Sequence, residues 1–474
     1  MRKPKLLIFL LAAGALGFYL LERLPEPALD AAAEPEAKYI FFFLSDGGGV
    51  TDMEIARIYS RVVLGEGLVV PDKIMKEGTL GLITTHAADS LTTDSAAAAT
   101  AMTAGCKAKI GALGICDDGR IPKTAIELAK EKGLRGGLVT TSTIYDASPA
   151  AFAGHVASRK YYNLIVDQYL RLQPDLLLGG GRDQFLPKGR PGSGRKDDKD
   201  MIAAFAQQGY AYVADRSELA RARGSKLLGL FTLGEMSFEL DRDKDKEPSL
   251  SEMTQAAIKF LDRDNRGFMV FIENENTDTA GHLTDLASKI HAYREFDRSV
   301  GLAYEFYRRH PRETLILVTS DHDSGGVGFT LALEEPGSRD GKKVAATEQD
   351  LKKIASISIS LRKAADILGP NPASDAVDRL MKDHFKGFTL APDLKRMLLA
   401  KQVPARNLYT DPVVMILGQM VANNTQAYWT AGGHTNQPVF VAALGAGAEM
   451  FRGYQDNTDF GRHLLALLGA KDSK

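Results

Sequence analysis

Three short stretches of the sequence combine carboxylates with imidazoles at spacings that suit a metal ion. Asp278 and His282 lie four residues apart in "DTAGH", which places both on one face of a helical turn. Asp321 and His322 are adjacent in "SDHDSGG", and His434 follows two glycines in "GGHTNQP". A mixture of oxygen and nitrogen ligands suits Zn²⁺. Each stretch alone is more typical of a helix cap or a surface histidine, so only their convergence favours a metal site.

Further oxygen ligands follow apolar runs. These are Asp46 after "YIFFFLS", Glu273 at the end of "GFMVFIE", and Asp146 and Ser148 in "DASP". Carboxylates gathered in a partly dry cleft repel one another and lose hydration unless cations neutralise them. The sequence therefore predicts bound metal if these side chains meet.

The elements that must position these residues are apolar runs without polar alternation, which predict strands buried on both faces of a sheet. They are residues 39–45, 135–141, 267–273, 314–320 and 439–445. Segments with apolar residues at helical spacing separate them, as in "TAIELAKEKG" and residues 287–310. This alternation predicts a three-layer, doubly wound α/β fold with a largely parallel sheet and helices on both faces. Ligands bind at the carboxyl ends of such strands.

Two other regions interrupt this pattern. Residues 335–430 are charged and mostly helical, and we interpret them as an insertion or cap within a single catalytic domain of residues 38–470. The glycine-rich stretches "DGGGVTD" and "LLLGGGRDQF" lack the lysine and spacing of a nucleotide P-loop, so we interpret both as turns.

The N-terminus indicates export. Arg2, Lys3 and Lys5 precede the apolar residues 6–21, and a polar, Pro-containing stretch follows up to residue 37. Such a segment is typical of a cleaved signal peptide or of a membrane anchor, and both alternatives place the rest of the chain in the periplasm or outside the cell.

Cysteine content and net charge add two expectations. Cys106 and Cys116 are the two cysteines, and in an oxidising compartment they form either a disulfide or two buried thiols. A net charge of -1, from 59 basic and 60 acidic residues, gives no electrostatic reason to expect a nucleic-acid partner.

A nucleophile can be identified in "TTDSAAAATAM". Thr93 or Asp94 would cap an Ala-rich helix whose first turn contains Ser95. In isolation this is more typical of a well-capped helix than of a catalytic site. A helix N-terminus nevertheless attracts anions such as phosphate, and a nearby Zn²⁺ would activate the hydroxyl group. Arg159, thirteen residues after Asp146, could hold two phosphate oxygens through its planar guanidinium.

With these residues in place, the chain resembles the alkaline phosphatases of the metal-dependent serine type. The resemblance spans about residues 38–468. It rests on ordered motifs: "SDGGG", "TDSAAAATAM", "DASPAAFAGHVASRK", "LLLGGGR", "ENENTDTAGH", "TSDHDSGG" and "GGHTNQPV". It implies an exported hydrolase of small phosphate monoesters, in which Ser95 is phosphorylated and water then releases inorganic phosphate.

The resemblance also implies two Zn²⁺ ions and one Mg²⁺ ion. One zinc would be held by Asp278, His282 and His434. The second zinc would be held by Asp46, Asp321 and His322. The magnesium would be held by Asp46, Ser148 and Glu273, with Asp146 acting directly or through a water. Asp46 would bridge two cations, and the glycines after it would allow the sharp turn that this requires.

Two positions depart from the family pattern. Thr279 stands where well-studied relatives carry a Lys or His near the phosphate, and Ser324 stands where many carry another His. The alternatives are a phosphodiesterase or sulfatase of the same superfamily and a phosphate-binding protein without catalysis. Against a sulfatase, no Cys/Ser-x-Pro-x-Arg motif is present; against a pure binder, Ser95 is retained. Relatives are commonly homodimers, which makes a dimer an expectation by analogy.

Overall fold

The computed structural model describes residues 37–332, 344–402 and 411–470. Residues 1–36, which carry the predicted signal peptide or anchor, lie outside the described residues. A helix with the length and apolar character needed to span a bilayer is not found among the residues that the structure describes.

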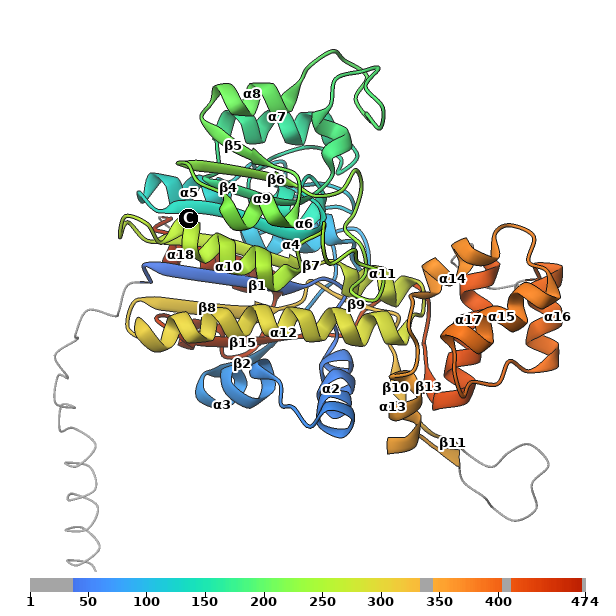
Figure 1. Ribbon diagram of the computed structural model, residues 1–474. Coiled ribbons are helices and arrows are strands. Elements are labelled where there is room, and N and C mark those ends of the chain that lie inside the picture. Colours follow the sequence, from blue (N-terminus) through green and yellow to red (C-terminus); the bar gives the residue numbers. More distant parts are fainter. Residues whose placement is uncertain (1–36, 333–343, 403–410, 471–474) are drawn as a thin grey trace, which may run out of the picture.

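A ten-stranded, mostly parallel sheet forms the centre of the molecule (Figure 1). Its strands, in spatial order, are β16 (Gly453–Gln455), β2 (Thr79–Ile83), β15 (Val439–Gly445), β8 (Thr314–Thr319), β1 (Tyr39–Ser45), β7 (Phe268–Asn274), β3 (Arg135–Thr143), β4 (Leu176–Gly180), β6 (Lys226–Leu230) and β5 (Tyr210–Val213). All neighbours pair in parallel except β15, which is antiparallel to both β2 and β8.

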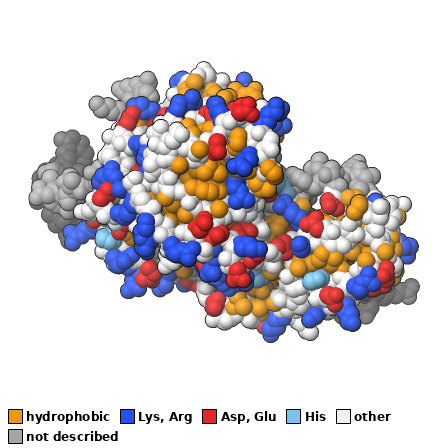
Figure 2. Space-filling model, turned by 45° about the horizontal axis from the view of Figure 1, so that its top comes forward, with side chains coloured by type: hydrophobic (Ala, Val, Ile, Leu, Met, Phe, Trp, Pro, Cys, Tyr) orange, Lys and Arg blue, Asp and Glu red, His pale blue; other side chains and the backbone are white. Residues whose placement is uncertain are grey.

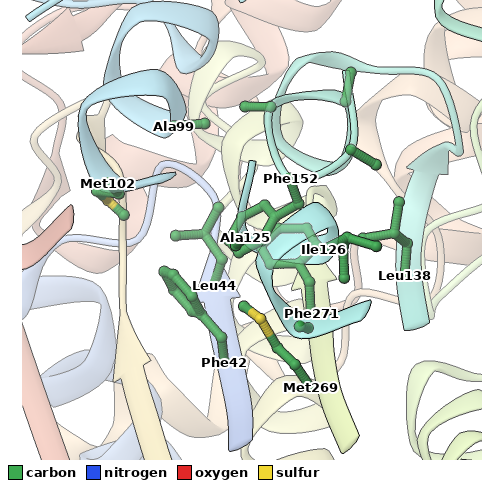
Figure 3. Close-up of a cluster of buried hydrophobic side chains, with 14 of the residues drawn as sticks. Phe42, Leu44, Ala99, Met102, Ala125, Ile126, Leu138, Phe152, Met269 and Phe271 are labelled. Carbon is green, nitrogen blue, oxygen red and sulfur yellow. The ribbon is translucent and has the colours of Figure 1, made fainter. Parts of the chain in front are cut away.

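Both faces of the sheet are covered, which explains why the central strands lack polar alternation. In β1, Ile40, Phe42 and Leu44 pack on one face, while Phe41 and Phe43 pack on the other. Figure 3 shows Phe42 and Leu44 within the first of these two cores, among side chains from helices and neighbouring strands. The predicted three-layer α/β fold is therefore confirmed.

Helices flank the sheet on both sides (Figure 1). The face of Phe42 is covered by α4 (Ser95–Ala104), α5 (Ala125–Glu131), α6 (Ala147–Ala151), α7 (Tyr162–Leu172), α8 (Met201–Gln207) and α18 (Asn457–Leu467). The face of Phe43 is covered by α2 (Val50–Tyr59), α3 (Met75–Glu77), α9 (Arg216–Arg221), α10 (Leu250–Leu261) and α12 (Leu286–Arg309). Helix α11 (Asn276–His282) directly follows β7.

Short helices and strand pairs complete the fold. The π-helical turns are Ser60–Leu64 and Val70–Ile74, and the 3₁₀ turns are Arg182–Phe185 and Ala448–Phe451. Three two-stranded sheets pair β9 (Asp323–Ser324) with β14 (His434–Thr435), β10 (Gly328–Phe329) with β13 (Ala427–Tyr428), and β11 (Leu331–Ala332) with β12 (Val344–Ala345).

The two glycine-rich stretches that were predicted to be turns have different structures. The turn expected after β1 is present at residues 46–49. The turn expected at residues 176–185 is wrong for its first half, because Leu176–Gly180 form the buried strand β4, and the 3₁₀ turn Arg182–Phe185 follows. Glycine is needed at both positions because neighbouring atoms come close to the strand. A Cβ atom on Gly179 would lie 2.9 Å from Cγ2 of Thr140, and one on Gly180 would lie 2.2 Å from the carbonyl oxygen of Gly234.

The segment predicted to be a helical insertion contains α13 (Glu348–Ile354), α14 (Leu361–Leu368), α15 (Ser374–His384), α16 (Pro392–Ala400) and α17 (Pro412–Thr425). These helices share a hydrophobic core that includes Leu380, Leu398 and Leu417. Figure 1 shows α14–α17 grouped beside α11 and β9, at one end of the sheet. The carboxylate of Asp285 connects α12 with α14. It accepts hydrogen bonds from the backbone N–H of Ser288 in α12 and from that of Leu361 in α14.

Charges of both signs lie next to each other on the face shown in Figure 2, in keeping with the near balance of acidic and basic residues.

Cys106 and Cys116 form a disulfide. Of the two alternatives for these cysteines, the structure therefore contains the cross-link.

Candidate active site

The carboxyl ends of neighbouring parallel strands bring the predicted carboxylates to one edge of the sheet. Asp46 directly follows β1, Glu273 lies near the end of β7, and Asp321 lies just beyond β8. The register of β1 against β7 and β8 keeps the three strand ends level. All three carboxylates are buried.

His434 reaches the same edge because β15 runs in the opposite direction to β8. The residues that precede an antiparallel strand lie where its parallel neighbours end. Strand β14 pairs with β9 there, with His434 opposite Ser324.

Gly47 makes the turn after Asp46 possible. Its φ is +64°, and a Cβ atom at this position would lie 2.6 Å from Oδ1 of Asp278 and 2.8 Å from Oγ of Ser324. Glycine is therefore required both for the backbone conformation and for the close approach of the two strand ends.

The first group of candidate ligands consists of Asp278 and His282 on α11 and His434 on β14. The Nε2 atom of His282 lies 3.0 Å from Oδ2 of Asp278 and 3.1 Å from Nε2 of His434. The Nε2 atom of His434 lies 3.6 Å from Oδ1 of Asp278. The four-residue spacing on a helix thus brings both α11 side chains to one point, as predicted.

The second group consists of Asp46, Asp321 and His322, all of them buried. The Nε2 atom of His322 lies 3.1 Å from Oδ2 of Asp321 and 3.5 Å from Oδ1 of Asp46. Although buried, Oδ1 of Asp46 and Oδ2 of Asp321 accept no hydrogen bond from any residue that the structure describes.

The spacing of both groups fits zinc. Donor atoms bound at 2.0–2.1 Å to a tetrahedral Zn²⁺ ion lie about 3.4 Å from one another. The distances from the histidine Nε2 atoms to the other ligand atoms of their own group range from 3.0 to 3.6 Å.

The outer nitrogens of two histidines support the same conclusion. Nδ1 of His282 donates to the carbonyl oxygen of Gly432 at 2.9 Å, and Nδ1 of His434 donates to that of Thr93 at 2.7 Å. A carbonyl oxygen only accepts, so each neutral ring carries its proton on Nδ1 and presents the Nε2 lone pair to the centre. Metal-bound histidines are oriented in this way.

The electrostatics of the site also call for cations. Burial, together with the carboxylates of Asp321 and Asp278, raises the pKa of Asp46 well above its usual range. Burial raises the pKa of Glu273 to about 8. Burial and the neighbouring imidazole of His322 lower the pKa of His434 to about 4. The charges of the protein alone do not balance at this edge.

The candidate magnesium ligands lie beside Asp46. Ser148 donates from Oγ to Oδ2 of Asp46 at 3.2 Å, and Thr140 donates to Oε2 of Glu273. Asp146 is the N-cap residue of α6, and its carboxylate accepts hydrogen bonds from Ser142 and Arg159. Asp46, Ser148 and Glu273 thus meet as predicted, whereas Asp146 is occupied by the guanidinium of Arg159.

Ser95 and Arg159 lie next to these groups. Ser95 is the first residue of α4, is 5% exposed, and its Oγ atom lies 3.3 Å from Nε2 of His322. Asp94 caps α4 by accepting from the backbone of Ala97, and it also accepts from Nη1 of Arg159 at 3.3 Å. Nη2 of Arg159 donates to Asp146 at 2.8 Å. The serine hydroxyl, the helix N-terminus and the guanidinium are therefore close together.

Comparison with known proteins agrees with this arrangement. The family model described as alkaline phosphatase matches residues 37–470. The chain belongs to the alkaline phosphatase family. Members of this metal-dependent family hydrolyse phosphoric monoesters, and this chain is a hydrolase of that class.

Three relatives illustrate how far the similarity extends. The chain is 31% identical to alkaline phosphatase 3 of Bacillus subtilis over 450 residues, 92% of this chain and 90% of that protein. The Thermus thermophilus alkaline phosphatase superposes with a TM-score of 0.82 at 28% identity, over 95% of this chain and 96% of that one. The cold-active alkaline phosphatase of Shewanella sp. gives 0.74 at 26% identity, over 91% and 99%.

The Ser95–His322 contact of this alkaline phosphatase differs from that of a Ser-His-Asp triad. In a triad, the carboxylate holds Nδ1 and leaves Nε2 for the serine. Here Oδ2 of Asp321 and Oγ of Ser95 both approach Nε2, at 3.1 and 3.3 Å. Because Nε2 faces carboxylates as well as Ser95, the arrangement does not match that of a triad histidine acting as general base.

Sequence reasoning missed a buried ion pair behind the alkaline phosphatase site. Lys289 on α12 lies 3.1 Å from Asp52 on α2, and both side chains are 2% exposed. Its Nζ atom donates to the carbonyl oxygens of Gly47 at 3.2 Å and Ser324 at 2.6 Å. Ser324 in turn donates to Oδ1 of Asp278. Nothing in the sequence around Lys289 distinguishes it from a surface residue of a charged helix.

Sequence reasoning also missed Glu275, which contacts Thr279, one of the two departures from the family pattern. Thr279 donates its hydroxyl proton to Oε1 of Glu275, a carboxylate that is 6% exposed. Burial and the carboxylates of Glu235 and Asp278 raise the pKa of Glu275 well above its usual range. Three acids close together in "ENENTD" were the available signal.

Proposed function

We propose that this protein is an exported phosphomonoesterase that works through a phosphoserine at Ser95, with two zinc ions and one magnesium ion at the carboxyl edge of the sheet. The observation that carries the proposal is the pair of ligand groups at tetrahedral spacing next to the Oγ atom of Ser95. A pure phosphate-binding protein has no need of a buried hydroxyl at this position.

Each cation would have its own set of residues. Asp278, His282 and His434 would hold one zinc, and Asp46, Asp321 and His322 would hold the other. Asp46, Ser148 and Glu273 would hold magnesium, with Asp146 contributing directly or through a water. When bound, the cations would neutralise charge on the phosphoryl oxygens and lower the pKa of a coordinated hydroxyl group.

The side chains of the protein would then perform two displacements. Ser95 Oγ attacks phosphorus and the ester oxygen leaves with the alcohol; water then breaks the new serine ester and releases inorganic phosphate. The N-terminus of α4 favours the negative charge of the phosphoryl group. Arg159 would turn its planar guanidinium toward two phosphoryl oxygens, a geometry that suits a dianionic monoester.

Substrate choice tests the reaction class. We expect turnover of p-nitrophenyl phosphate with zinc and magnesium at alkaline pH, and far slower turnover of bis-p-nitrophenyl phosphate. Faster turnover of the diester would identify a phosphodiesterase, and no turnover of either compound by zinc-loaded protein would favour the binding protein.

The nucleophile is tested by Ser95→Ala, with Ser90→Ala in the same segment as the matched control. We expect Ser95→Ala to retain zinc and to lose at least about 10³-fold in kcat, as nucleophile removal does in serine enzymes. After acid quenching in the presence of phosphate, intact-protein mass spectrometry should find a phosphorylated species in the wild type and in Ser90→Ala. A phosphorylated Ser95→Ala protein would contradict the assignment.

Export is supported by the basic and apolar N-terminal sequence and by the Cys106–Cys116 disulfide, which suits an oxidising compartment. Fractionation with N-terminal sequencing tests it. A soluble periplasmic or extracellular protein that begins near residue 34 indicates a cleaved signal, and an intact membrane-bound chain indicates an anchor at residues 6–21. Recovery in the cytoplasm would contradict both.

We also propose that residues 38–470 form a single catalytic domain and that the protein is a homodimer. Cooperative unfolding in one calorimetric transition is expected of a single domain. Light scattering of the purified protein measures the oligomeric state directly.

A further inference from the structure

The loop closed by the Cys106–Cys116 disulfide lies between the nucleophile helix and the segment that carries Arg159. It begins just after α4 ends at Ala104. Both cysteines are buried, whereas Lys109 and Ile110 at the tip are exposed. Little apolar burial therefore holds the tip in place, and the cross-link supplies the constraint that packing does not.

On one side, the loop is bonded to α4 and its cap. Thr100 on α4 donates to the carbonyl oxygen of Ala112 at 3.1 Å and accepts from the backbone N–H of Gly114 at 3.0 Å. The N–H of Gly111 donates to Oδ1 of Asp94 at 3.1 Å. Asp94 is the residue that precedes Ser95 and caps its helix.

On the other side, the loop is bonded to the Arg159 segment. The backbone N–H of Arg159 donates to the carbonyl oxygen of Gly111 at 2.7 Å. Leu113 and Val156 exchange two backbone hydrogen bonds, of 3.0 and 2.9 Å. The Nδ1 atom of His155 donates to the carbonyl oxygen of Gly114 at 3.0 Å.

Gly111 is therefore the meeting point of the two sides. Its N–H holds the Asp94 carboxylate and its carbonyl oxygen holds the Arg159 backbone, while the Arg159 guanidinium bonds to the other oxygen of the same Asp94 carboxylate. These three hydrogen bonds link Gly111, the guanidinium and the N-terminus of the nucleophile helix.

We propose that the disulfide-closed loop of residues 106–116 is a positioning element that sets the phosphate-binding geometry of Arg159. This inference rests on the proposed role of Arg159 in binding phosphate. It assigns to the disulfide a task at the active site in addition to stabilising the fold, although neither cysteine contacts the candidate ligand groups.

The double variant Cys106→Ala/Cys116→Ala tests the inference. We expect the competitive inhibition constant of inorganic phosphate and the KM for p-nitrophenyl phosphate to rise by about 10-fold, because small misplacements of binding groups are costly. Zinc content should be unchanged and kcat should change by less than about threefold, since Ser95 and the metal ligands do not bond to the loop tip. Unchanged phosphate inhibition would overturn the inference.

A second variant keeps the inference testable if the cysteine variant does not fold. Thr100→Val removes both hydroxyl bonds to the loop while leaving the disulfide and the side-chain volume in place. We expect the inhibition constant of phosphate to rise by about threefold. Arg135→Gln, which breaks ion pairs at the start of β3, serves as the control for lost stability alone and should leave phosphate inhibition unchanged.

Arg159→Ala separates failure of this inference from failure of the proposed function. If Arg159→Ala alone leaves phosphate inhibition unchanged, the assigned role of Arg159 is wrong. If it weakens inhibition but the cysteine variant does not, the positioning role of the loop is wrong. In the Arg159→Ala background, removal of the disulfide should produce no further change in the inhibition constant, because the guanidinium through which it acts is gone.

Discussion

Asp264 at the amino end of the central strands and Asp46 at their carboxyl end have pKa values shifted in opposite directions. At the amino end, Arg135 begins β3 and donates to Asp175 at 3.0 Å and to Asp264 at 2.6 Å. The hydrogen bond from Arg135 lowers the pKa of Asp264. At the carboxyl end, burial and neighbouring carboxylates raise the pKa of Asp46 instead.

The difference between these pKa shifts distinguishes charges that are neutralised within the protein from charges that a bound cation would neutralise. The amino-end acids find their cation within the protein, in the guanidinium of Arg135. Asp46 and Asp321 each keep a buried oxygen without a hydrogen bond from any described residue. The proposed cations would supply the missing partners at that end of the sheet.

The largest expected effect follows from removing a charge at the carboxyl end. Asp46→Asn takes away the carboxylate shared by two of the proposed cation sites, and we expect kcat for p-nitrophenyl phosphate to fall by about 10³-fold or more. The exposed Asp198→Asn is the matched control and should retain full activity. Wild-type turnover by Asp46→Asn would remove the reason for placing metal at this edge.

The converse change at the amino end should affect stability and not turnover. Arg135→Gln leaves Asp175 and Asp264 without their buried partner, and we expect the free energy of unfolding to fall by about 2 kcal/mol, because both carboxylates keep contact with water. The exposed Arg266→Gln, which also bonds to Asp264, should lose less than about 1 kcal/mol. Denaturant unfolding measures both changes. A loss of kcat in folded Arg135→Gln would show that the two ends are not independent.

The ion pair behind the metal ligands should produce an intermediate effect. Lys289→Met removes the donor that holds the carbonyl oxygens of Gly47 and Ser324. Because residues that orient ligands commonly contribute 10–100-fold to metal affinity, we expect zinc affinity to fall by about that factor. Zinc titration against a competing chelator measures it. Equal zinc affinity in Lys289→Met and the exposed control Lys259→Met would contradict the positioning role.

The stability of the metal-free protein should depend on pH through the groups at the carboxyl end of the sheet. Glu273, with its pKa raised to about 8, and Asp46, with its pKa also raised, bind more protons in the folded state than in the unfolded state. Stability linked to such groups is lost as pH rises toward the folded-state pKa. The pKa values of His282 and His322 lie above 6.5, so these groups lose their contribution in the same direction.

We therefore expect the metal-free protein to lose about 2 kcal/mol of unfolding free energy between about pH 6.5 and pH 8. The zinc-loaded protein should not show this loss, because cations replace the protons. Urea unfolding at several pH values, with and without zinc, checks the expectation. Parallel pH profiles for the two forms would contradict it.

Much of the fold could be predicted because buried parallel strands have a strong signal. The predicted runs match β1, β3, β7, β8 and β15 to within two residues. The edge strand β2 was missed because Leu80 and Leu82 are exposed, which makes its sequence less distinctive, and β4 was missed because its glycines are also typical of turns.

The candidate ligands could be predicted because each lies at a strand end or at a helical spacing that fixes where its side chain points. The supporting contacts could not. Lys289 and Asp52 meet through the packing of α12 against α2, and Gly111 meets Arg159 through a loop between distant segments. Such contacts depend on tertiary geometry and leave no local pattern in the sequence.

Whether the carboxyl end of the sheet works with cations can be tested by measuring the metal content of the purified protein beside its turnover of p-nitrophenyl phosphate before chelation, after chelation and after zinc is restored. We predict two zinc ions and one magnesium ion per chain, loss of turnover when they are removed, and recovery when zinc and magnesium return. Full turnover by protein from which all metal has been removed would contradict the conclusion that the carboxyl end of the sheet works only with cations.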